Sequence, residues 1–195
     1  MGLEERLRKA LKATAKEFDD ALTPFDPTSG DKTYPERMVS YYYIQALARA
    51  LAPASVLLEL PVTGERGHRM DNHVDALVFN DREVVVAEFK LGWAQSYWTS
   101  LARDLARLQG PVAQEIRGRF TDKRRRRPFV FLGADCWWQH VANVWKTGSR
   151  ARGWTLPRTL RTAHRDYLCV YRGRGKDYDG YYFTWALIPF DEMAA

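Results

Sequence analysis

Two charged residues interrupt an apolar strand pattern near the middle of the chain. Residues 83–90 read Glu-Val-Val-Val-Ala-Glu-Phe-Lys, and alternate side chains of a strand share a face, so Glu88 and Lys90 point the same way. Both faces are apolar up to Glu88, which predicts a central strand covered on both sides. A salt bridge at a strand end is the simplest alternative, but buried charges are rarely kept for stability. Breaks of this kind tend to mark function.

A third charged residue, Asp75, stands at the start of a neighbouring apolar run. Residues 73–79 and 83–90 are joined across Asn80-Asp81-Arg82, which predicts a hairpin turn. Asp75 precedes Glu88 by thirteen positions (88 − 75), so the hairpin could bring it alongside Glu88. Two carboxylates suit a hard divalent cation such as Mg²⁺, which takes oxygen ligands, water and substrate phosphate. With Lys90 beside them, the set predicts metal-assisted hydrolysis of a phosphodiester.

A transition-metal site is a competing interpretation of the same region. Asp71, His73 and Asp75 would share one face if this stretch is extended. Zinc sites need three or four convergent ligands, and no cysteine or second close histidine joins these residues. We therefore interpret His73 as a polar neighbour of the carboxylates.

The rest of the chain predicts elements that place these residues in an α/β fold, a mixed sheet flanked by helices. Apolar periodicity predicts helices over residues 3–22, 35–51, 97–108, 112–120 and 137–145, and strands over residues 56–62, 73–79, 83–90, 129–132, 167–172 and 181–188. Glu36, in the first turn of the second helix, shares a stripe with Tyr43 and Leu47. It should therefore point toward whatever that stripe buries, although the helix dipole alone would also favour it there.

Length and composition predict one soluble domain. The 195 residues are 46% hydrophobic, which is enough for a sizeable core. Cys136 and Cys169 have neither a metal-binding spacing nor the number for a disulfide framework, so we expect a reducing, cytoplasmic setting. The sequence shows no apolar run of membrane-spanning length and no hydrophobic signal-peptide core, so no membrane partner is expected.

The net charge of +6 and pI of about 9.4 favour a polyanionic partner, and DNA is the expected one. Two groups of basic residues could contact phosphates. One is the pair Arg103 and Arg107, one turn apart on the polar face of their helix. The other is a run of five basic residues, for which a solvated loop without phosphate contacts is the simplest alternative. That run consists of Lys123, Arg124, Arg125, Arg126 and Arg127.

The pattern resembles the PD-(D/E)xK nuclease superfamily, which includes many restriction and repair nucleases. The resemblance covers about residues 35–135, as a helix with an acidic residue, a strand, an Asp-bearing strand, a Glu-x-Lys strand, a helix and a further strand. It implies a restriction-endonuclease-like core within the single domain 1–195. The N-terminal helix 1–22 and a C-terminal helix and β-hairpin, about 136–195, would be additions to that core.

Residue by residue, the resemblance implies a metal held by Asp75, Glu88 and the backbone carbonyl of Phe89. Lys90 matches the family lysine, and Glu36 matches the acidic residue that many members carry on the first helix.

Two residues could be the metal-binding aspartate of the family, because the family often opens the Asp-bearing strand with a hydrophobic residue followed by Asp. The chain offers Met70-Asp71 and Val74-Asp75. Asp75 is followed directly by the apolar run and has the more usual spacing, so it is favoured and Asp71 is held in reserve.

The resemblance implies a Mg²⁺-dependent DNA nuclease, most simply an endonuclease, with Mn²⁺ as an alternative cofactor. RNA or a small phosphodiester are alternative substrates. A catalytically inactive nucleic-acid-binding or protein-interaction module with the same fold is the rival function, and the intact set of Asp75, Glu88 and Lys90 favours the enzyme. One catalytic centre cuts one strand, so concerted double-strand cleavage would require a homodimer.

Overall fold

The computed structural model describes residues 1–22, 36–62, 73–90, 95–108, 111–121, 127–151, 153–172 and 179–190. The helices are α1 (Leu3–Leu22), α2 (Glu36–Ala50), α3 (Gln95–Leu108), α4 (Pro111–Ile116) and α5 (Gln139–Thr147), with a π-helical turn η2 (Arg117–Thr121) and a 3₁₀ turn η3 (Arg158–Leu160). The strands are β1 (Ser55–Pro61), β2 (His73–Phe79), β3 (Glu83–Lys90), β4 (Arg127–Cys136), β5 (His164–Tyr171) and β6 (Tyr181–Pro189).

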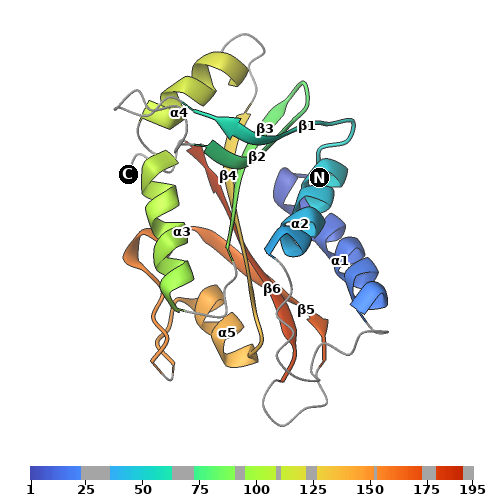
Figure 1. The fold of residues 1–195 in the computed structure, drawn as a ribbon, viewed down its shortest axis with the longest axis vertical. Coiled ribbons are helices and arrows are strands. Elements are labelled where there is room, and N and C mark those ends of the chain that lie inside the picture. The colour runs from blue at the N-terminus through green and yellow to red at the C-terminus, as the bar shows by residue number, and fades with distance from the viewer. Residues whose placement is uncertain are drawn as a thin grey trace.

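The strands form one mixed sheet in the order β1-β2-β3-β4-β6-β5. Strands β3 and β4 are parallel and the other neighbouring pairs are antiparallel. Parallel neighbours need a long crossover, and α3 lies between β3 and β4 in the chain. Helices α1 and α2 lie on one side of the sheet, and α3 and α5 lie on the other (Figure 1). The expected α/β fold, a mixed sheet flanked by helices, is confirmed at this level.

Strand β3 is central and buried on both faces, as its uninterrupted apolar run predicted. Val84 and Val86 pack in a cluster with Leu101 and other residues of α3, α5 and β4. Val85, on the opposite face, packs in a second cluster with residues of α1 and α2. Because Val84, Val85 and Val86 are fully buried, β3 is a rigid platform for the two charged residues at its end.

Helix α3 covers the sheet with one stripe of apolar side chains, and this stripe does not include Tyr97, the first residue of the predicted helix over residues 97–108. Trp98, Leu101, Leu105 and Leu108 are its buried side chains, whereas Tyr97 is only half-buried. The spacing of three, four and three residues from Trp98 keeps these side chains on one face, and the larger indole takes the buried position.

The C-terminal part of the chain extends the same sheet. The predicted β-hairpin is β5 and β6, and β6 pairs with β4 as far as Cys136. Strand β4 is therefore longer than predicted, and α5 begins at Gln139 rather than at Trp137. The predicted helix over residues 112–120 is divided into α4 and η2. None of the helices in these described ranges is long and apolar enough to cross a membrane.

Tyr43 of α2 joins the helix to the middle of the sheet. Its buried hydroxyl lies 2.6 Å from the carbonyl oxygen of Ala134 and 2.9 Å from that of Thr184. Its ring stacks on Phe89 with centroids 5.7 Å apart. Both rings lie against Gly133, where an added Cβ would come within 2.9 Å of Phe89 and 3.0 Å of Tyr43. Glycine at this position therefore lets the rings approach the backbone of β4.

We predict that Gly133→Ala lowers the free energy of unfolding by about 1–3 kcal/mol, because a methyl group must displace two packed rings. Denaturant unfolding followed by tryptophan fluorescence measures this change. Gly118→Ala is the matched control, because a Cβ there would meet no atom within 4 Å. Equal losses in the two variants would contradict the proposed packing role of Gly133.

Candidate functional site

The β2–β3 hairpin sets which residues of the two strands lie opposite each other. The side chain of Asn80 closes the turn, where its Oδ1 accepts the backbone N–H of Glu83 at 2.8 Å. The strands then pair in register as far as Ala76 and Ala87. The next residues along the two strands are the predicted carboxylates.

Asp75 lies beside Glu88 at the point where this pairing ends. Its Oδ2 accepts the backbone N–H of Phe89 at 2.7 Å, so the side chain takes the place of a sheet hydrogen bond. Leu77, two positions further along β2, packs in the cluster that contains Leu105 of α3. Since alternate residues share a face, Asp75 takes the α3 side of the sheet, as Glu88 does.

Glu88 is the most deeply buried charged group of the site, with a side chain only 2% exposed. Burial and the nearby charge of Asp75 raise the pKa of Glu88 to about 9, and the positive charges of Arg107 and Lys90 oppose this shift. Arg107 donates from Nη2 to Glu88 Oε1 at 2.5 Å. The carboxyl group is therefore enclosed by protein and held by a single guanidinium.

Helix α3 supplies two charged residues that complete the site. Arg107 also donates from Nη1 to the carbonyl oxygen of His73 at 3.0 Å, so it links α3 to both β2 and β3. Asp104, one turn earlier, has Oδ1 3.8 Å from Arg107 Nη2 and Oδ2 3.9 Å from Lys90 Nζ. Acidic and basic groups thus alternate around the end of β3. Lys90 pairs with Asp104, and Arg107 pairs with Glu88.

Asp104 is a site residue that the sequence interpretation missed. Its side chain is 20% exposed, and burial is the main cause that raises the pKa of this carboxyl group. No donor in the described part of the chain hydrogen-bonds to its buried Oδ2. The spacing of residues in α3 could have identified it. Asp104 stands three residues after Leu101 and four before Leu108, so it is predicted to lie on the buried side of the helix.

The outer margin of the site contains a strained residue. Glu59 of β1 has a φ of 50°, in the left-handed region that non-glycine residues rarely adopt. The neighbouring register pairs join Leu58 to Ala76 and Leu60 to Val74, which places Glu59 opposite Asp75. Such strain often accompanies functional sites.

His73 lies at the same margin, as the sequence interpretation expected of a polar neighbour. Its Nε2 is 3.0 Å from Glu59 Oε2. Both side chains are largely exposed, at 47% for His73 and 69% for Glu59. They therefore border the carboxylates from the solvent side, on the edge strand and its neighbour.

The donor set fits a hard divalent cation better than zinc. The described ranges contain no group of three or more His, Cys, Asp or Glu side chains arranged to hold a metal ion. Mg²⁺ does not need such a cage, because it takes one or two carboxylates and completes its shell with water and phosphate oxygens. Asp75 and Glu88, whose carboxyl groups lie beside each other, would hold it.

The other predicted site residues have different placements. Asp71, Lys123, Arg124, Arg125 and Arg126 lie outside the described residues, as does the side chain of Glu36, whose backbone begins α2. Arg103 and Arg127 are exposed, which leaves them accessible to a phosphate. Arg107 is only 26% exposed, because it reaches inward to Glu88.

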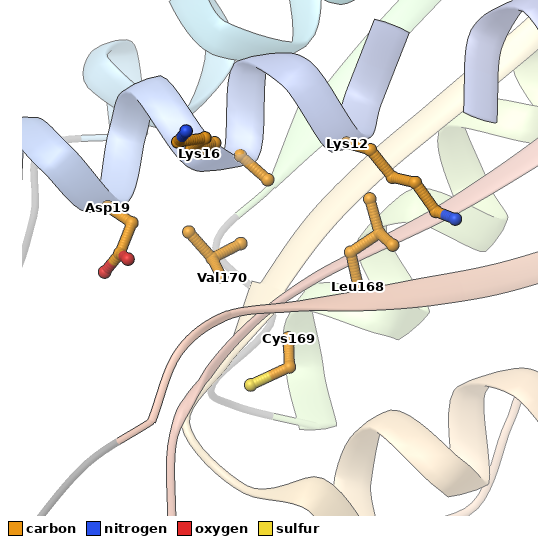
Figure 2. A pocket seen from close by; sticks show the side chains of 7 residues that line it. Lys12, Lys16, Asp19, Leu168, Cys169 and Val170 are labelled. Atoms are coloured by element: carbon orange, nitrogen blue, oxygen red, sulfur yellow. The ribbon is translucent and has the colours of Figure 1, made fainter. Parts of the chain in front are cut away.

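A small hollow lies elsewhere, between α1 and β5, on the side of the sheet away from Glu88. Lys12, Lys16 and Asp19 of α1 line it on one side, Leu168 and Val170 of β5 point toward the helix from the other, and the Cys169 side chain points away from the helix (Figure 2). It contains two lysines from the surface of one helix and an aliphatic wall. The end of β3, with its enclosed carboxylates, is the stronger candidate for chemistry.

Comparisons with protein-family models, curated proteins and solved structures found no match.

The raised pKa of Glu88 predicts how stability depends on pH. A carboxyl group whose pKa is about 9 in the folded protein and about 4.5 when unfolded stabilises the fold fully below pH 4.5, and this contribution is lost as the pH rises toward 9. We predict that Glu88→Gln becomes progressively more stable relative to the wild type between pH 5 and 9. The slope should not exceed about 1.4 kcal/mol per pH unit. Denaturant unfolding without metal measures the difference, and parallel pH profiles would contradict the shifted pKa.

Proposed function

We propose that this protein is a Mg²⁺-dependent phosphodiesterase that hydrolyses DNA, with Asp75, Glu88 and Lys90 at its catalytic centre. The observation that carries the proposal is the enclosed Glu88 carboxyl group, 2% exposed, which lies beside Asp75. In this proposal Asp75 and Glu88 bind the cation, and Lys90 positions water or stabilises negative charge on the phosphate.

The energetic cost of the site supports a functional origin. Charged groups lose solvation on burial, and replacing a buried ion pair by apolar residues is often neutral or stabilising. Strand β3 is otherwise apolar, so a hydrophobic residue at Glu88 would continue its pattern. A strongly perturbed pKa next to further charged groups is characteristic of active sites.

The order of the elements supports the nuclease interpretation of this site. Helix α2, strands β1, β2 and β3, helix α3 and strand β4 follow one another as the resemblance to PD-(D/E)xK nucleases implies. The Asp-bearing strand and the Glu-x-Lys strand are adjacent and antiparallel. On this basis α1, α5, β5 and β6 would be additions to a restriction-endonuclease-like core.

The rival proposal is a nucleic-acid-binding module that has lost catalysis. The Arg107–Glu88 contact favours it, since a guanidinium already balances the buried carboxylate. The end of β3, however, places a second carboxyl group, that of Asp75, next to Glu88, which an ion pair with Arg107 does not require, and two adjacent oxygen ligands favour a site that receives a cation.

DNA is the preferred substrate because of the charge of the chain. Its net charge of +6 favours binding to a polyanion through counterion release. Arg103 is exposed on the helix that supplies Asp104 and Arg107, so it could contact a backbone phosphate next to the catalytic centre.

We predict that Glu88→Gln and Lys90→Ala each lower DNA cleavage in Mg²⁺ by about 10²-fold or more, because each removes a charge that acts in the transition state. Binding of DNA should change little in both variants, since affinity comes mainly from basic residues elsewhere. Cleavage of linear and plasmid DNA measures the first effect, and fluorescence anisotropy without metal measures the second.

Glu83→Gln is the matched control for these variants. Glu83 begins the same strand and pairs with Arg6 of α1, on the opposite face of the sheet. Its removal should leave cleavage by the folded protein unchanged. Intact cleavage in Glu88→Gln together with a destabilised fold would identify a structural ion pair and favour the binding module.

We also predict that Arg103→Ala weakens DNA binding and reduces the slope of log affinity against log salt by about 1, because one fewer counterion is released. The slope is measured by anisotropy across a series of salt concentrations. An unchanged slope would mean that Arg103 does not contact phosphate.

A further inference from the structure

Arg107 occupies the position of a counter-ion at the carboxyl group that the proposed function assigns to the metal. Its Nη2 lies 2.5 Å from Glu88 Oε1, and the Glu88 side chain is 2% exposed. Asp75 Oδ2 already accepts a hydrogen bond from the backbone of Phe89. A cation approaching Glu88 from solvent therefore meets protein atoms and the guanidinium first.

The guanidinium is held from several sides, yet its binding is incomplete. Its second donor, Nη1, bonds to the carbonyl oxygen of His73 at 3.0 Å. Its buried Nε has no hydrogen-bond partner among the residues that the structure describes. An unsatisfied buried donor costs free energy, and this cost opposes the contact that Arg107 makes with Glu88.

An alternative acceptor is already close to Arg107. Asp104, one turn earlier on α3, has Oδ1 3.8 Å from Arg107 Nη2, and no described donor hydrogen-bonds to its buried Oδ2. The long arginine side chain is 26% exposed, so its head can move without unfolding α3. Arg107 thus has a second carboxylate within reach if it leaves Glu88.

We propose that Arg107 is an exchangeable counter-ion of Glu88, which a divalent cation must displace to bind. This inference rests on the proposed function and adds a regulatory property to the same site. Because Arg107 contacts the buried carboxyl group of Glu88, it lowers the apparent affinity of that group for metal. The affinity is reduced by the fraction of molecules in which Glu88 is free of the guanidinium.

The test is the affinity of the DNA-free protein for Mn²⁺, measured by electron paramagnetic resonance of the unbound ion. Arg107→Met keeps much of the aliphatic length of the side chain and removes its charge. We expect it to raise the Mn²⁺ affinity by about tenfold or more, because no guanidinium competes for Glu88. Arg107→Lys keeps one charge but loses the two-pronged contact with Glu88 and His73, so it should give a smaller increase.

Two further variants serve as controls. Arg49→Met removes an arginine from an exposed ion pair with Glu17 on α1, so the Mn²⁺ affinity should stay at the wild-type value. The double variant Glu88→Gln with Arg107→Met should lose the gain, because the ligand itself is gone. A gain that survives in the double variant would overturn the proposal, since the ion would then bind elsewhere.

The remaining outcomes separate this proposal from the proposed function. If Arg107→Met binds Mn²⁺ no more tightly than the wild type, while Glu88→Gln abolishes cleavage, only the exchange is overturned. If neither protein binds Mn²⁺ and the wild type cuts no DNA, both proposals are overturned. Should Arg107→Met fail to fold, an unchanged affinity in Arg107→Lys overturns the exchange.

Discussion

The burial of Glu88 is the constraint on which the rest of the site depends. A carboxyl group enclosed at the end of an apolar strand must be balanced by a proton or by a positive charge. Burial and the charge of Asp75 raise the pKa of Glu88 to about 9, which favours the proton, whereas Arg107, which contacts Oε1, favours the ionised form. A divalent cation would need to displace the proton or the guanidinium. In the proposed function, the burial of Glu88, which is costly for the fold, would also make the site sensitive to cations.

The fold around Glu88 is built to hold this charge in one place. Strand β3 is packed by apolar clusters on both faces, and Tyr43 fastens α2 to the neighbouring β4. The β2–β3 hairpin brings Asp75 alongside, and α3 brings Asp104 and Arg107 across the same end of the strand. Because each charged side chain comes from a regular element, local loop motion alone would not separate them. Such support is what a preorganised site requires.

The strand faces and the hairpin turn of this arrangement could be predicted from the sequence. The contacts between elements that are far apart in the chain could not. Alternation along residues 83–90 was sufficient to place Glu88 and Lys90 on one face, and the turn at Asn80 was sufficient to predict the bounds of β2 and β3. The contact between Arg107 and Glu88 depends on how α3 crosses the sheet, which periodicity does not specify. Arg107 was interpreted as a polar-face residue because its long side chain hides how far it reaches inward. The joining of β6 to β4 depends likewise on pairing across fifty residues.

The most direct test of the central claim is to locate a metal ion at the end of β3. Crystals of the protein soaked in Mn²⁺ should give an anomalous diffraction peak between the carboxylates of Asp75 and Glu88, with the Arg107 guanidinium moved away from Glu88 Oε1. The peak should be absent from crystals of Glu88→Gln treated in the same way. A wild-type crystal with no peak at this position, and with Arg107 still in contact with Glu88 at saturating Mn²⁺, would contradict a metal site.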